Sequence, residues 1–83
     1  MAAFANAVNN RQQVVGTAQL AGGEQRAFLW REGKMWDLNG LLAPNSGWFL
    51  LEANDINESG QILCLARSRN GQMLMVRLTP GGR

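Results

Sequence analysis

The chain contains two near-copies of one segment, and this duplication constrains its fold more than any other feature. The stretch ANAVNNRQQVVGTA occupies residues 5–18, and ANDINESGQILCLA occupies residues 53–66. Ala, Asn and Gln recur at matching places, and valines of the first copy meet isoleucine or leucine in the second. A segment repeated within one chain predicts a fold built from repeated units, each packed against its neighbour.

Short apolar runs separated by turn residues predict an all-β, antiparallel fold. Clusters of Gly, Pro, Asn and Ser follow one another too closely to leave room for long helices. We expect strands at the start of the first copy and at residues 13–18, 26–30, 35–38, 48–57, 61–67 and 73–79. A four-stranded unit is thus followed by a three-stranded one in a single domain over 1–83. We place repeat 1 at about residues 4–40, a linker at 41–47 and repeat 2 at about 48–80.

Both copies predict a hairpin turn that begins at an asparagine, Asn9 or Asn57. Gly60 supplies a left-handed backbone conformation in the second turn. The first turn has no glycine, so we expect backbone strain there. The next loop of the second copy aligns as two residues shorter than in the first, and this alignment places Arg31 and Arg77 at matching positions.

Repeats of about 40–45 residues with four strands each are typical of β-propeller blades. Propellers contain about four to eight blades, so two blades leave apolar faces uncovered. Unless the chain is part of a longer protein, we expect identical copies to complete the ring as a trimer or tetramer. A dimer that pairs exposed sheet edges through the strand at residues 73–79 is the alternative.

The first copy and its continuation, GGEQRAFLWREGKMWDLNGL, resemble the His-Ala-Phe (HAF) extracellular repeat of bacterial proteins. The pattern of that family is roughly A-x-A-I-N-x-x-G-Q-V-V-G-x-S, a Gly-containing loop, and then H-A-F-L-W-x-x-G-x-M-x-D-L-G. The stretch WFLLEANDINESGQILCLARSRNGQMLMVRLTP resembles the last repeat of such proteins. Arg26 stands where the family has His, and Cys64 replaces a strand Gly. The resemblance covers residues from about 5 to 80 and implies a propeller-like fold, often in an exported protein, with no established enzymatic activity.

Charge and hydropathy argue against nucleic-acid and membrane partners. The formal net charge is only +2, and the nearest approach to a basic cluster is Arg67, Arg69 and Arg77, which a hairpin would bring together. The longest apolar runs are too short to span a bilayer. The first ten residues lack the basic region and apolar core of a secretory signal. We therefore expect a cytosolic protein or an exported one whose leader has been removed, and the compartment stays open.

The residue types exclude several kinds of catalytic and metal site. The chain has no His and one Cys, so a nucleophile with a histidine base, a His/Cys metal centre and an internal disulfide are all excluded. We predict that Cys64 is a small buried hydrophobe. Asp37, Glu52, Asp55 and Glu58 are the acids considered for catalysis. We interpret Asp37 as a strand-end residue that binds backbone amides, and we predict no catalytic residue, metal or cofactor.

The candidate ligand-binding residues are two tryptophans and three polar side chains: Trp36, Trp48, Asn45, Arg31 and Arg77. We expect the third tryptophan, Trp30, to pack between blades. The sequence thus predicts a non-enzymatic β-repeat module that self-associates through its blades and binds a carbohydrate or protein ligand. Two alternatives stay open: a lectin-like carbohydrate-binding protein, and a small hydrolase with acids at subunit boundaries.

Overall fold

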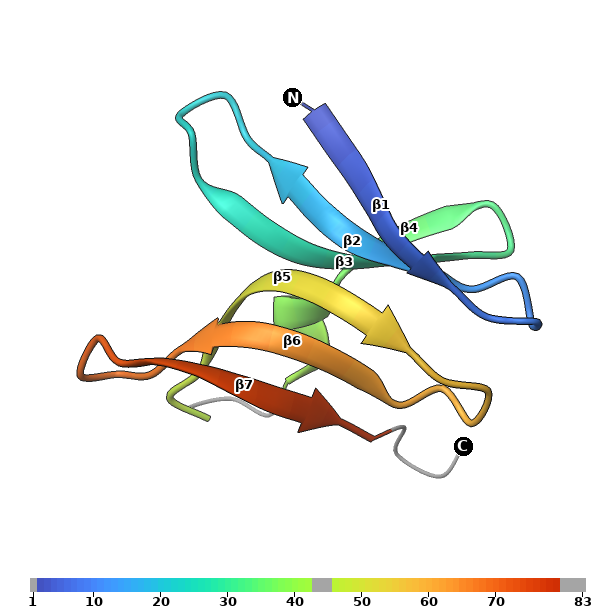
Figure 1. The fold of residues 1–83 in the computed structure, drawn as a ribbon. Helices are drawn as coiled ribbons and strands as arrows, with labels where there is room; N and C mark the ends of the chain where they lie inside the picture. The colour runs from blue at the N-terminus through green and yellow to red at the C-terminus, as the bar shows by residue number, and fades with distance from the viewer. Residues whose placement is uncertain (1, 43–45, 80–83) are drawn as a thin grey trace.

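The computed structural model describes residues 2–42 and 46–79. Over these residues the chain is all-β and antiparallel, as the spacing of turn residues predicts. One short 3-10 helix, η1, accompanies the strands (Figure 1). The elements are β1 (Ala2–Val8), β2 (Val14–Gln19), β3 (Gln25–Arg31), β4 (Lys34–Asp37), η1 (Leu38–Leu41), β5 (Phe49–Ile56), β6 (Ile62–Arg67) and β7 (Met73–Leu78).

The strands form two separate sheets that stack as two layers (Figure 1). The first sheet has the order β1-β2-β3-β4, and the second has the order β5-β6-β7. The predicted division into four strands and three strands is therefore confirmed. β5 is the strand of the second sheet that lies against β1, β2 and β3. Residues 80–83, where we expect no fourth strand for the second repeat, lie outside the described residues.

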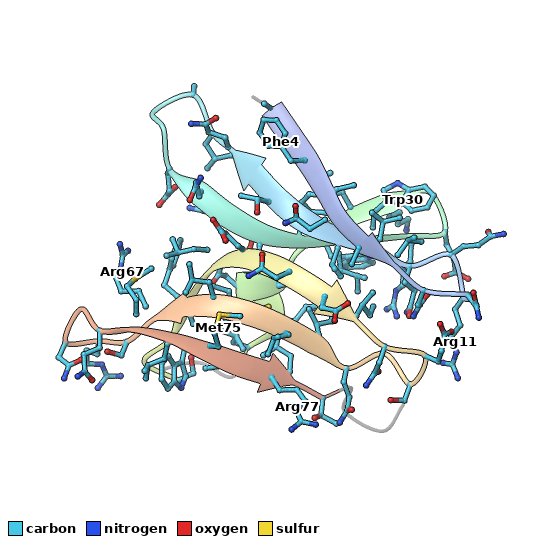
Figure 2. The ribbon with its side chains drawn as sticks, viewed as in Figure 1. Phe4, Arg11, Trp30, Arg67, Met75 and Arg77 are labelled. Atoms are coloured by element: carbon cyan, nitrogen blue, oxygen red, sulfur yellow. The ribbon has the colours of Figure 1, made fainter. Side chains whose placement is uncertain are left out.

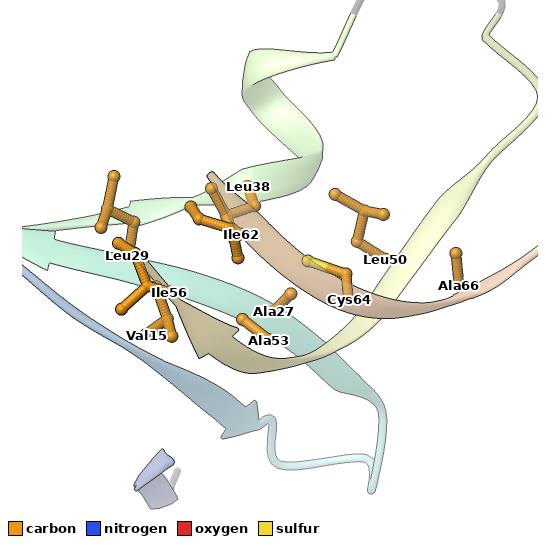
Figure 3. Close-up of a cluster of buried hydrophobic side chains, with 10 residues drawn as sticks. All are labelled: Val15, Ala27, Leu29, Leu38, Leu50, Ala53, Ile56, Ile62, Cys64 and Ala66. Atoms are coloured by element: carbon orange, nitrogen blue, oxygen red, sulfur yellow. The ribbon is translucent and has the colours of Figure 1, made fainter. Parts of the chain in front are cut away.

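A hydrophobic core fills the space between the two sheets (Figure 3). Because successive side chains of a strand point to opposite faces, every second residue of the central strands enters this core. Leu38 of η1 joins it from the connection between the sheets. Each fully buried Val, Leu or Ile contributes about 1.5–3 kcal/mol relative to an exposed one. The buried members are Val15, Ala27, Leu29, Leu38, Leu50, Ala53, Ile56, Ile62, Cys64 and Ala66.

The segment after β4 fastens the first sheet to the second. Asp37 caps η1 by accepting a hydrogen bond from the backbone N–H of Asn39 at 2.9 Å, which confirms the amide-binding role predicted for it. The side chain of Asn39 in turn accepts from the Leu50 N–H at 2.7 Å and donates to the Leu50 carbonyl at 2.9 Å. Asn39 thus acts as one more strand residue beside β5. The linker predicted over 41–47 overlaps the end of η1, and its residues 43–45 lie outside the described residues.

The two hairpin turns have the same backbone path with different residues. In each turn the opening asparagine accepts from the backbone N–H four residues later, Gln13 or Gln61. Gly60 has φ +87°, and Gln12, at the equivalent place, has φ +61°. A left-handed conformation costs a non-glycine residue roughly 1–2 kcal/mol. The predicted strain of the first turn is therefore confirmed and lies at Gln12.

The strand register corrects one prediction about the repeat. Gln19 pairs with Gln25 in the first sheet, and Arg67 pairs with Met73 in the second, so both connections have the same length. Glycines with φ +87° and +89° close both turns. The predicted two-residue deletion is wrong, and every residue of the second repeat is 48 positions beyond its counterpart.

Arg31 and Arg77 therefore do not occupy matching positions, because Arg77 is the counterpart of Leu29. Residues 75–77 are correspondingly the counterparts of Ala27-Phe28-Leu29. The two repeats therefore differ more in sequence here than the alignment with the shorter loop implies.

Candidate functional site

The predicted ligand-binding residues do not converge on one site. Trp36 lies in the edge strand β4, and Trp48 precedes β5. Arg31 ends β3 beside a cleft between the sheets, whereas Arg77 lies on the far side of the second sheet (Figure 2). Asn45, the fifth predicted residue, lies outside the described residues. These side chains therefore belong to separate surfaces.

Arg67 and Arg77 lie toward opposite ends of the second hairpin. Arg67 pairs with Met73 at one end of the hairpin, and Arg77 pairs with Leu63 near the other (Figure 2). The Arg67 guanidinium instead lies over the Phe49 ring, 5.3 Å from its centroid. The grouping of Arg67 and Arg77 expected from the hairpin is wrong, because their cross-strand pairs are four positions apart along the hairpin.

Three of the four acidic residues considered for catalysis take part in local contacts. Asp37 forms an ion pair with Arg26 at 2.9 Å, and Glu58 accepts hydrogen bonds from the Asn10 backbone N–H at 3.0 and 3.2 Å. Asp55 accepts from the backbone N–H of Ile56. In residues 2–42 and 46–79, no group of three or more metal-ligating side chains occurs. In the structure, these carboxylates stabilise turns and connect neighbouring elements.

Cys64 is fully buried in the core between the sheets, as predicted. Burial disfavours the thiolate and raises the pKa of Cys64 to about 11. The thiol is therefore protonated at neutral pH and inaccessible to solvent. Its role is to fill core volume.

A shallow hollow of about 560 Å³ surrounds Trp48. Its other lining residues include Ser68, Asn70 and Gln72, which offer hydroxyl and amide groups beside the partly exposed indole. An aromatic face flanked by such groups is suited to a polyhydroxylated ligand. Trp36, the other tryptophan predicted to bind a ligand, does not line this hollow.

Each sheet also has a face that the other sheet does not cover. We call the face of each sheet that contacts the other sheet its inner face, and the opposite one its outer face. On the outer face of the first sheet, Val8, Val14, Trp30 and Met35 form one continuous cross-strand row. Val8 is 64% exposed, Trp30 38% and Met35 47%. Trp30, expected between blades, thus points away from the second sheet (Figure 2).

The outer face of the second sheet is also apolar at its centre. Leu63, Leu65 and Met75 alternate with the core residues of β6 and β7. Leu63 is 40% exposed and Met75 50%. A hollow of about 250 Å³ opens beside Leu63 between Asp55 and Arg77. Apolar side chains on both sides of both sheets are typical of sheets that are covered on both faces.

The sequence also carries a signal for these apolar outer faces. Consecutive apolar residues occur in β2 (Val14, Val15), in β3 (27–30) and in β6 (62–66). Strands with only one covered face alternate apolar and polar residues, whereas strands covered on both faces do not. Unbroken apolar runs of this kind are therefore typical of strands that are covered on both faces.

No helix in the described part of the chain has the length and apolar character to cross a membrane. No family model, curated protein or solved structure matches this chain. The resemblance to the HAF repeat therefore stays a prediction.

Proposed function

We propose that the protein is a non-enzymatic assembly and binding module that self-associates through its blade-like sheets. The observation that supports this proposal is the exposed apolar row on the first sheet together with the exposed apolar centre of the second. A chain of 83 residues buries only roughly 60–65% of its unfolded surface. Covering two further faces would add apolar burial at about 25 cal/mol per Å².

Self-association is tested by static light scattering across a dilution series. We expect a mass of several chains at high concentration, since apolar faces of this kind favour association. A wild-type protein that is folded and monomeric at every concentration would remove the proposal. The assembly expected from the blade count is a trimer or tetramer, with six or eight blades.

A second candidate function is carbohydrate binding, and the hollow around Trp48 favours it. The partly exposed indole lies beside hydroxyl and amide side chains there. A glycan array with the wild-type protein and the Trp48→Ala variant tests this role. Binding that Trp48→Ala abolishes supports a lectin, and an array without signal at high protein concentration contradicts it.

A further inference from the structure

The two sheets face each other with different sides of the repeat, so equivalent residues lie on the inner face of one sheet and on the outer face of the other. The inner row of the first sheet contains Val15 and Leu29, whose counterparts, 48 positions later, are Leu63 and Arg77 on the outer face of the second sheet. Conversely, Ile62 and Leu78 belong to the inner face of the second sheet. Their counterparts, Val14 and Trp30, lie on the outer face of the first sheet.

Two faces of different kind therefore meet inside the molecule. We call the face that carries Val15 and Leu29, or in the second repeat Leu63 and Arg77, the forward face. The opposite face, which carries Ile62 and Leu78, or in the first repeat Val14 and Trp30, is the backward face. Inside the molecule the forward face of the first sheet packs against the backward face of the second. Each chain leaves one face of each kind open: the backward face of its first sheet and the forward face of its second. Such a pairing of unlike surfaces is heterologous, and its repetition gives rings or filaments.

We infer that the outer face of the first sheet docks onto the outer face of the second sheet of another copy, reproducing the interface between its own sheets. This inference rests on the proposed function and specifies its geometry. The partner is a second copy of this chain, because the chain already contains one example of this interface.

The apolar side chains of the two outer faces are complementary in this arrangement. Val8 and Val14 take the places that Ile56 and Ile62 have in the internal core. In the inferred contact these two valines meet Leu63 of the other copy. The hollow of about 250 Å³ beside that leucine receives their side chains. Two aliphatic side chains thus fill a space that is open in the single chain.

Trp30 and Arg77 form the most specific pair of the inferred contact. Their counterparts, Leu78 and Leu29, line the same cleft between the two sheets. The Trp30 indole of one copy therefore lies beside the Arg77 guanidinium of the next. A cation placed over an indole ring is attracted by the negative face of that ring. This explains why an arginine is tolerated where the first repeat has leucine.

Polar contacts between the repeats follow the same 48-residue spacing. Asn6 donates from Nδ2 to the Ala53 carbonyl at 3.0 Å, and Asn9 donates from Nδ2 to the Asn57 carbonyl at 3.0 Å. Each donor therefore binds a residue 47 or 48 positions ahead. The equivalent bonds between copies run from Asn54 to the Ala5 carbonyl and from Asn57 to the Asn9 carbonyl.

The donors for these bonds are available. Asn54 lies at one of the two bulges of β5, at the position equivalent to Asn6 at the bulge of β1. Its exposed side chain has no hydrogen-bond partner among the residues that the structure describes. Nδ2 of Asn57 donates only to Gln61 within those residues. Nδ2 of Asn9, its counterpart, donates both to Gln13 and across the interface.

The experiment blocks one face at a time. Val8→Asp places a charge on the outer face of the first sheet, and Met75→Asp places one on the outer face of the second. Leu41→Asp is the matched control, because Leu41 is 57% exposed and lies in η1, on neither face. Circular dichroism confirms that each variant is folded, and Val8→Lys or Met75→Lys replaces an Asp variant that is not.

We expect light scattering to give the wild-type mass for Leu41→Asp and the mass of one chain for each face variant alone. An equimolar mixture of Val8→Asp and Met75→Asp should give the mass of two chains, because each supplies the face that the other lacks. A dimer of either variant alone indicates a symmetric contact and overturns the inference. A monomeric mixture, or wild-type assembly of both variants through the β7 edge, also overturns it. A monomeric wild type instead contradicts the proposed function itself.

Discussion

Gly16 is the position where a single methyl group should disturb the fold most. A Cβ atom at this residue would lie 2.0 Å from the carbonyl oxygen of Phe4 and 2.9 Å from the Phe28 ring. Ordinary carbon contacts are about 3.5–4.0 Å, so the β1 backbone must move by more than an ångström. The ring of Phe28 has little room to yield, since that side chain is buried.

We expect Gly16→Ala to lower the free energy of unfolding by about 3 kcal/mol. Overpacking a core costs about 1–3 kcal/mol, and loosening β1 from β2 weakens backbone hydrogen bonds of about 1 kcal/mol each. The total stability of a chain of 83 residues is roughly 4–12 kcal/mol. The loss is therefore a large part of the whole.

The assay is urea unfolding followed by tryptophan fluorescence, at a concentration where light scattering gives a monomer. Gly22→Ala is the control, because a Cβ atom at Gly22 has no neighbour within 4 Å. A Gly16→Ala variant within about 0.5 kcal/mol of this control would refute the packing argument.

Three further predictions concern the first turn, the core thiol and the inferred contact. Gln12→Gly should raise the free energy of unfolding by about 0.5–1 kcal/mol, because glycine adopts φ +61° without strain; an unchanged or lower urea midpoint would contradict the strain at this residue. Burial raises the pKa of Cys64 from 9.0 to about 11, so the folded state retains the proton longer than the unfolded state. Thermal stability should thus be full below pH 9 and decrease between pH 9 and 11, and Cys64→Ala should flatten that decrease. Asn54→Ala should weaken self-association about fivefold or more while leaving the unfolding of the monomer unchanged, since one intermolecular hydrogen bond contributes about 1 kcal/mol; equal association of variant and wild type would exclude the Asn54 bond.

The architecture was largely predictable because its signals are local. Turn residues such as Asn57 and Gly60 have specific backbone roles. The positions of such residues therefore predict the seven strands and their division into two units. The residue-by-residue alignment of the repeats was not predictable in the same way. The sequences of the two second turns differ, and only the pairing of Arg67 with Met73 shows that they have equal length.

The candidate surfaces were predicted less well than the strands. Tryptophan type alone suggested ligand contact for Trp36 and Trp48, but side-chain direction depends on strand register. A bulge at Asn6 also shifts which residues of β1 face the core, and nothing in the residue types marks it. The inversion of faces between the sheets could be recognised only when the register and the core were known together.

Contacts between labelled and unlabelled copies test the head-to-tail arrangement most directly. The measurement is an isotope-filtered nuclear Overhauser experiment on a mixture of methyl-labelled and unlabelled wild-type protein. We expect cross-peaks from the Val8 and Val14 methyl groups of one copy to Leu63 and Met75 of another. Cross-peaks that join Val8 or Val14 to the same residues of a second copy, or no intermolecular cross-peaks in an assembled sample, would contradict the account.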